Sequence, residues 1–235
     1  MKIRAAALLV LAAIVVATVY RLPGDIDRVV TDGIAFYGTV MTKAKVSATE
    51  VHIASASGKG TISNLRIGNP AGFKTTHALM VDRIDVDIDI ASIAQDVVIV
   101  RLIIVNAPDV MYEKGEAMTN FDALHRNIAN YLDKTGAMNR MQGKKLIVEE
   151  LTICNSRAQA SAHFMDGKAI SVPLHDMTLK NLGTARGGIT PGELGQEVVD
   201  ALKAKLTRSV NFDRMKESTG EDLDKAGVPV NRLIK

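Results

Sequence analysis

Apolar and charged residues alternate over a long segment, VDRIDVDIDIAS, from Val81 to Ser92. Successive side chains of an extended chain point to opposite faces, so the alternation predicts a β-strand with one buried face. The apolar face carries Ile84, Val86, Ile88 and Ile90. The polar face carries Arg83, Asp85, Asp87 and Asp89. One strand cannot bury such a face alone, so the chain must also supply neighbouring strands and a cover.

Further extended runs predict the rest of the sheet. They are residues 44–67, 96–113, 144–153, 158–164 and 168–182. The first run contains a turn rich in Ser and Gly and therefore predicts a hairpin. The sequence NPAGF at 69–73 predicts a loop, because Asn-Pro and Gly both favour turns. A short echo, Thr61–Leu65 against Thr178–Leu182, fits an internal repeat or chance equally well.

Three segments have helical periodicity and can cover part of the sheet. The first carries the apolar positions Ile26, Val29, Val30, Ile34, Tyr37 and Met41. It either plugs the end of the sheet or lies along a bilayer surface. The second begins at Asn120 and has Phe121, Leu124, Ile128 and Leu132 on one side. The third begins at Thr190, which has capping-box spacing to Glu193, with Pro191 in the first helical position.

The N-terminus predicts a membrane-targeting segment. Lys2 and Arg4 precede an uncharged run, Ala5–Tyr20, that Arg21 closes. At about 1.5 Å per residue the helical run is about 24 Å long, slightly short of the roughly 30 Å hydrocarbon core. Its central apolar residues are Leu8, Leu9, Leu11, Ile14, Val15 and Val16. An uncleaved anchor, oriented with the N-terminus inside, is favoured over a cleaved signal peptide and over a buried core helix.

Composition narrows the function classes. Hydrophobic residues make up 47% of the chain, aromatic residues 4%, and Trp is absent, so the core must be aliphatic. The net charge of +3 comes from charges of mixed sign, which disfavours nucleic-acid binding. A single cysteine, Cys154, excludes an internal disulfide and a paired-cysteine metal site.

No catalytic or cofactor motif is found, so an enzyme is disfavoured and no cofactor is expected. Asp85, Asp87 and Asp89 lie on one face and could invite a Ca²⁺ or Mg²⁺ ion. Alternate residues of a strand are about 7 Å apart, however, which is too far for a single ion. A solvated strand face is the favoured interpretation, and no metal site is predicted.

Three stretches, in this order, resemble the N-terminal region of the AsmA-like family: GKGTISNLRIGNPAGF, VDRIDVDIDIASI and IIVNAPDVMYEKGEAMTNFDALHRNI. The resemblance covers roughly residues 33–132, and the helix that follows GGIT resembles that of smaller members. It implies a protein of the inner membrane of a Gram-negative-type bacterium, with a single membrane pass and its body in the periplasm. It also implies a taco-like sheet whose apolar inside shields lipid chains.

The expected fold class is therefore α+β: an N-terminal transmembrane helix followed by a curved, mainly antiparallel sheet with flanking amphipathic helices. The expected domains are a membrane anchor at 1–22, an AsmA-like curved-sheet domain at 23–212 and a polar tail at 213–235. Eight or nine strands at about 4.8 Å each would give a sheet of only about 40 Å, too short to bridge an envelope.

Two functions are expected. In the first, Ile84, Val86, Ile88 and Ile90 line a groove that holds acyl chains, and the protein contributes to envelope lipid transport or outer-membrane homeostasis. In the second, the protein is a structural or accessory subunit of a membrane-associated complex and does not transport lipid. The expected partners are the membrane, lipid, and a second copy or an envelope protein complex.

Overall fold

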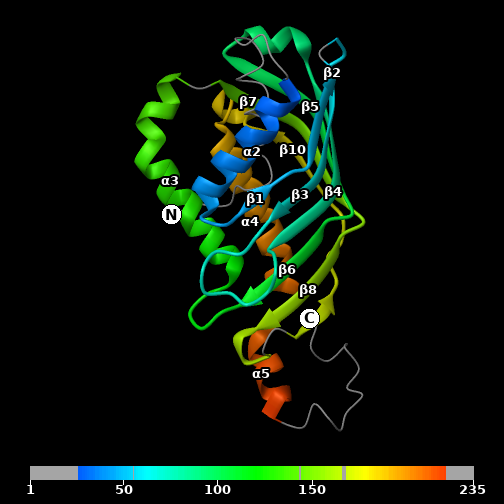
Figure 1. Ribbon diagram of the computed structural model, residues 1–235, viewed down its shortest axis with the longest axis vertical. Helices are drawn as coiled ribbons and strands as arrows, with labels where there is room; N and C mark the ends of the chain where they lie inside the picture. The colour runs from blue at the N-terminus through cyan, green and yellow to red at the C-terminus, as the bar shows by residue number, and fades with distance from the viewer. Residues whose placement is uncertain (1–25, 55, 143, 166–167, 221–235) are drawn as a thin grey trace.

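Ten strands pair into one curved sheet, and three helices lie against the same face of it (Figure 1). The computed structural model describes residues 26–54, 56–142, 144–165 and 168–220. The strands are β1 (Val46–Ser47), β2 (Glu50–Ala54), β3 (Lys59–Ile67), β4 (Leu79–Ile88), β5 (Val97–Asn106), β6 (Asp109–Lys114), β7 (Lys145–Cys154), β8 (Arg157–Ala162), β9 (Ala169–Val172) and β10 (Met177–Leu182). The α-helices are α2 (Ile26–Thr42), α3 (Asn120–Gln142), α4 (Pro191–Ser209) and α5 (Phe212–Gly220). Short 3₁₀ helices are η1 (Ile90–Ala94), η2 (His163–Met165) and η3 (Thr184–Arg186).

The alternating segment forms β4, which lies in the middle of the sheet. On one side β4 pairs with β3, and on the other with β5 and then β6, which lie end to end. Three further pairs of strands also lie end to end: β1 with β2, β7 with β8, and β9 with β10. We call each such pair, and each of the single strands β3 and β4, a ribbon of the sheet. The ten strands therefore form six ribbons, and the sheet is narrower than its strand count indicates.

The ribbons bend along a shared line across the sheet. Ala107 (φ 50°) separates β5 from β6, and Asn155 (φ 56°) separates β7 from β8. These bends are adjacent, because the N–H of Ala107 donates to the carbonyl of Cys154 (2.9 Å). Left-handed backbone interrupts a strand and redirects it. Aligned interruptions in neighbouring ribbons therefore bend the sheet as a whole.

Two pairings are parallel, β5 with β7 and β6 with β8, whereas all other pairings among the described strands are antiparallel. Parallel neighbours need a long crossover, and α3 provides it between β6 and β7. The expectation of a mainly antiparallel sheet is confirmed. The parallel pairs are an addition that the strand patterns did not predict.

The three helices predicted to cover the sheet are confirmed, and two details differ. Tyr37 was expected on the apolar stripe of α2, either against the sheet or on a bilayer surface; it is 43% exposed, because Val30 and Ile34 define the side that packs on the core. The segment expected to be a polar tail begins with α5, and Met215 within it is buried. α5 is held partly by Phe212, whose ring lies 5.3 Å from that of Tyr112. The folded body thus extends beyond residue 212.

The predicted capping box of α4 is present. The N–H of Glu193 donates to Thr190 Oγ1 (3.2 Å), and the N–H of Thr190 donates to the Glu193 carboxylate (2.7 Å). We expect Thr190→Ala to lower the free energy of unfolding by about 1 kcal/mol, because the hydroxyl acceptor is lost. Urea unfolding followed by circular dichroism measures this cost. Thr190→Ser keeps the hydroxyl and should retain most of the stability; an equal loss in both variants would contradict the capping explanation.

Candidate functional site

The predicted lipid groove is filled by the protein's own side chains. Ile84, Val86 and Ile88 are 1%, 7% and 1% exposed and belong to the main hydrophobic core. Ile90 lies in η1 and packs, partly buried, against the same core. Along the sheet, Ile84 is flanked by Ile62 of β3 and Val105 of β5.

The cover over this face comes from the helices. Each helix buries apolar side chains in the same core: Val30 and Ile34 of α2, Phe121 and Leu124 of α3, and Leu194, Val198, Leu202 and Leu206 of α4. The aliphatic face thus forms the interior of the domain, and an acyl chain could reach it only if helices moved away.

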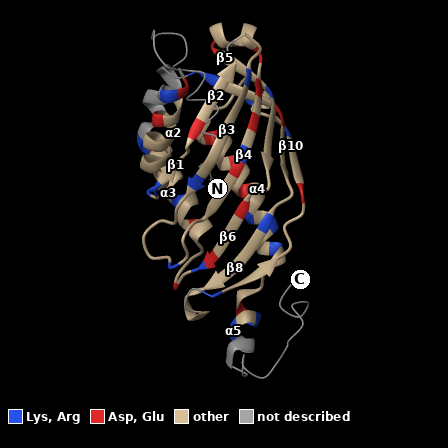
Figure 2. Ribbon diagram, turned by 45° about the vertical axis from the view of Figure 1, so that its right-hand side comes forward, with Lys and Arg blue, Asp and Glu red and all other residues tan. Residues whose placement is uncertain are grey.

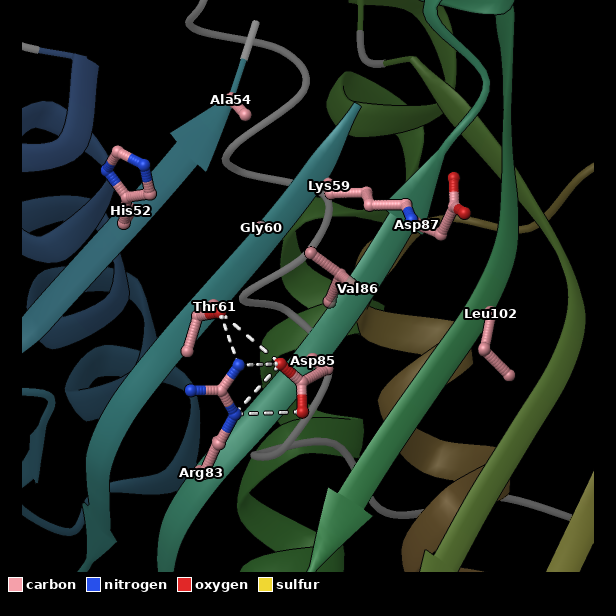
Figure 3. A pocket seen from close by; sticks show the side chains of 10 residues that line it. All are labelled: His52, Ala54, Lys59, Gly60, Thr61, Arg83, Asp85, Val86, Asp87 and Leu102. Atoms are coloured by element: carbon pink, nitrogen blue, oxygen red, sulfur yellow. Dashed lines mark hydrogen bonds and ion pairs between the residues drawn. The ribbon is translucent and has the colours of Figure 1, made fainter. Parts of the chain in front are cut away.

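Charged residues of both signs occur along the strands (Figure 2), and the opposite face of the sheet carries Arg83, Asp85 and Asp87 of β4 beside Leu102 and Ile104 of β5. A depression of about 380 Å³ opens there between β2, β3, β4 and β5. Arg83 lies across it and donates to Asp85 (2.9 Å from Nε) and to Thr61 Oγ1 (3.2 Å), as Figure 3 shows. Ligand pockets are about 300–1,000 Å³, so this depression is at the small end. Arg83 and Asp85 already satisfy each other.

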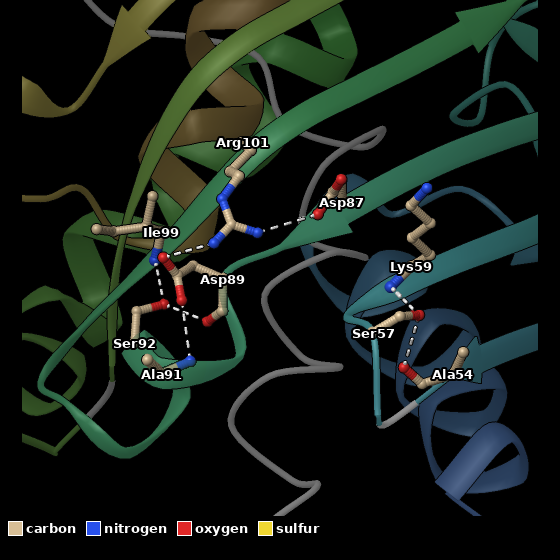
Figure 4. Close-up of polar contacts among 9 residues, drawn as sticks. All are labelled: Ala54, Ser57, Lys59, Asp87, Asp89, Ala91, Ser92, Ile99 and Arg101. Atoms are coloured by element: carbon tan, nitrogen blue, oxygen red, sulfur yellow. Dashed lines mark hydrogen bonds and ion pairs between the residues drawn. The ribbon is translucent and has the colours of Figure 1, made fainter.

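Asp85, Asp87 and Asp89 are each paired with an arginine. Arg83 binds Asp85, while Arg101 of β5 lies 3.4 Å from Asp87 and 2.8 Å from Asp89 (Figure 4). Asp89 also accepts from the N–H of Ala91 (2.9 Å) and so caps η1. Guanidinium groups therefore balance the charges of these three carboxylates. Among the described residues no group of His, Cys, Asp and Glu is placed to hold a metal ion.

A buried polar cluster joins segments that lie far apart in the sequence. Asn120, fully buried at the start of α3, accepts hydrogen bonds from the N–H groups of Glu113 and Phe121 (both 3.0 Å). Its Nδ2 donates to the Met111 carbonyl (2.7 Å) and to Asn69 Oδ1 (2.8 Å). Asn120 therefore connects β6, α3 and the loop that contains NPAGF.

Glu113 fixes the same loop from the strand side. Glu113 is 2% exposed, and its carboxylate accepts from the N–H groups of Lys74 (2.8 Å) and Thr75 (2.9 Å) and from the Thr75 hydroxyl (2.5 Å). Asn69 Nδ2 donates to the carbonyls of Thr75 (2.8 Å) and His77 (3.1 Å). Asn69, Glu113 and Asn120 lie within sequence motifs, but the motifs predict no shared role for them. Their mutual bonding makes the cluster a structural element.

Beside this cluster lies a buried histidine. His77 is 7% exposed, and its Nδ1 lies 2.9 Å from the Thr76 hydroxyl. Its Nε2 lies 3.8 Å from Asp109 Oδ2 and makes no hydrogen bond with the described residues. Burial lowers the pKa of His77, since the loss of water disfavours the imidazolium more than the Asp109 carboxylate favours it.

This lowered pKa predicts a loss of stability in mild acid. Unfolded His77 takes up its proton near pH 6.5, above the folded-state value, so the free energy of unfolding should fall as the pH drops below 6.5. The loss should be complete once the folded-state pKa has been passed. Urea unfolding above and below pH 6.5 measures it, and His77→Gln should show a smaller decrease than the wild type. Equal decreases in the two proteins would contradict the prediction.

One helix face carries large apolar side chains that nothing described covers. Phe36, Tyr37 and Val40 of α2 are 63%, 43% and 45% exposed. The two rings pack edge to face, with centroids 5.2 Å apart. The helical periodicity predicts Tyr37 in the apolar stripe, but it does not predict this exposed face.

No protein-family model matches this chain, and no curated protein is similar to it in sequence. The resemblance to the AsmA-like family therefore stays a prediction. The predicted anchor residues Leu8, Leu9, Leu11, Ile14, Val15 and Val16 lie outside the described residues. Within residues 26–220, apart from the gaps at 55, 143 and 166–167, no helix is both long and apolar enough to cross a membrane.

Proposed function

We propose that this protein is a non-enzymatic, membrane-tethered accessory protein of the bacterial envelope, with its folded body on the periplasmic side. The uncharged run Ala5–Tyr20 behind Lys2 and Arg4 supports the tether and its orientation. The order of the motifs that resemble the AsmA-like family supports the envelope location.

The observation that carries this proposal is the closed interior. A transport groove needs apolar surface that a lipid can reach, whereas Ile84, Val86 and Ile88 are at most 7% exposed. The energy of burying this face already contributes to folding, at about 25 cal/mol per Å² of apolar surface. An accessory protein needs only a stable body held at the membrane.

Lipid handling is the second candidate, and one observation favours it. The inward residues of strands β4, β5 and β7 are all aliphatic: Val81, Ile84, Val86 and Ile88 of β4, Val98, Val100, Ile103 and Val105 of β5, and Leu146, Val148, Leu151 and Ile153 of β7. Such a face could hold acyl chains at about 0.8 kcal/mol per buried CH₂ if the helices lifted off. This function therefore requires an open state in which α2, α3 and α4 leave the sheet.

Native mass spectrometry of the full-length chain in mild detergent separates the two functions. For the accessory function we expect a stoichiometric protein partner or a second copy, without retained phospholipid. Phospholipid that stays bound at a fixed ratio, together with rapid amide exchange in α2, α3 and α4, would overturn the accessory function in favour of lipid handling. A monomer without lipid or partner would contradict both.

A further inference from the structure

The two long sides of α2 differ in what they contact. One side packs into the core through Val30 and Ile34, which are 0% and 1% exposed. The other presents Phe36, Tyr37 and Val40 to solvent. The whole chain has only five phenylalanines and four tyrosines, so two adjacent exposed rings call for an explanation. Clustered exposed apolar groups on a folded protein usually mark a contact surface.

The sequence that precedes α2 indicates what this exposed face contacts. The uncharged run Ala5–Tyr20 ends shortly before α2 begins at Ile26. Pro23 and Gly24 lie between them, and both residues disfavour a continuous helix. If the run is held in a bilayer, α2 starts close to the surface of the same bilayer.

The charges around the face are consistent with a phospholipid surface. Arg28, Lys43 and Lys45 are exposed at the two ends of α2, and Arg21 precedes it in the sequence. Asp32 offsets part of this charge, since its carboxylate lies 3.9 Å from Arg28 Nε. Aromatic rings flanked by Lys and Arg favour the headgroup region, where the rings bury their apolar faces and the cations meet anionic lipid.

The position of the face along α2 fixes the helix orientation. Phe36 lies ten residues after Ile26, which is about 15 Å along a helix at about 1.5 Å per residue. A helix that stood upright on the membrane would carry the rings out of the headgroup region. They reach the boundary with the acyl chains only if α2 lies flat, with the sheet on its far side.

We propose that Phe36, Tyr37 and Val40 form a second contact with the bilayer that holds the N-terminal anchor. This inference rests on the proposed tether and adds an orientation to it. α2 lies along the lipid surface, and the outer face of the sheet, which carries Arg83 and Arg101, points toward water. The body is thus held in one fixed orientation.

The absence of Trp from the chain allows a direct test. Phe36→Trp places a single tryptophan in the exposed face, and Leu102→Trp places one on the outer face of the sheet, so that fluorescence excited selectively at tryptophan reports one position in each variant. Each full-length variant is reconstituted into vesicles of phosphatidylcholine and phosphatidylglycerol, with and without brominated acyl chains. We expect the Phe36→Trp variant to emit at shorter wavelength than the Leu102→Trp variant, to be quenched by brominated lipid and to resist quenching by iodide. The Leu102→Trp variant should emit at longer wavelength, should not be quenched by brominated lipid and should be quenched by iodide.

Flotation of the same vesicles reports the tether separately. Protein that fails to float with the vesicles after alkaline washing would overturn the proposed tether itself. If both variants float, but iodide quenches the Phe36→Trp variant as readily as the Leu102→Trp variant and brominated lipid quenches neither, only the second contact is overturned. In that case the face would be free for a protein partner.

Discussion

Replacing Asn120 by alanine is expected to lower the free energy of unfolding by about 3 kcal/mol or more, since several buried polar groups lose their partners at once. Alanine leaves the Glu113 N–H, the Met111 carbonyl and Asn69 Oδ1 without the hydrogen bonds that Asn120 makes with them. Each group then bears its own desolvation cost, which is largest at Glu113 and Met111, because these residues and Asn120 are buried. Urea unfolding of the full-length chain, followed by circular dichroism, measures the loss.

Two companion variants identify the cause. Asn130→Ala makes the same substitution on the exposed side of α3, where it should be neutral or slightly stabilising. Asn120→Asp keeps the shape but replaces the Nδ2 donor with an oxygen that faces Asn69 Oδ1 and the Met111 carbonyl. It should therefore destabilise at least as much as alanine. A near-neutral Asn120→Asp would show that side-chain volume, and not hydrogen bonding, sets the cost.

Local signals predicted much of the secondary structure. The alternation of Val81–Ser92 predicted β4, and the capping box predicted the first residue of α4. The echo between Thr61–Leu65 and Thr178–Leu182 also has a local cause. Asn64 (φ 50°) and Asn181 (φ 55°) both adopt left-handed backbone, which asparagine tolerates better than most residues, and a buried leucine follows each. The echo thus reflects a shared strand irregularity and does not require a repeat.

Strand pairing was less predictable, because pairing joins residues that are distant in the sequence. Nothing in the runs 96–113 and 144–153 indicates that β5 and β7 pair in parallel. That pairing depends on α3 crossing over the sheet, and the helix pattern alone does not say where the chain returns. The bends at Ala107 and Asn155 are likewise separate in the sequence and adjacent only in the fold.

The polar cluster illustrates the same limit at the level of a site. Asn69, Glu113 and Asn120 each stand out as a polar residue at a turn, a strand end or a helix start. Only tertiary structure shows that Asn69 and Asn120, 51 positions apart, share a hydrogen bond. The apolar row of β4 shows the converse. Alternation predicted that one face is buried, but it does not distinguish burial by lipid from burial by helices.

Ile84→Ala is expected to distinguish burial by helices from burial by lipid. If helices bury Ile84, the free energy of unfolding should fall by about 3 kcal/mol, within the usual range of about 2–5 kcal/mol for truncating a buried isoleucine. The side chain is 1% exposed, lies between Ile62 and Val105, and belongs to the core that α2, α3 and α4 complete. Interiors are close-packed, so its removal leaves a cavity that the neighbours fill only in part. Urea unfolding without added lipid gives the value.

Ile104→Ala is the matched control, because Ile104 lies on the neighbouring strand β5 but on the outer, half-buried face. Its loss should be about 1 kcal/mol, since less apolar surface is removed from water on folding. If Ile84 instead lined a groove that opens for acyl chains, the two substitutions would cost similar amounts without lipid. Ile84→Ala would then reduce the phospholipid retained by the purified protein. A large loss in the free energy of unfolding for Ile84→Ala, with unchanged lipid content, is the result expected if the protein's own helices fill the inner face of the sheet, as the accessory function requires.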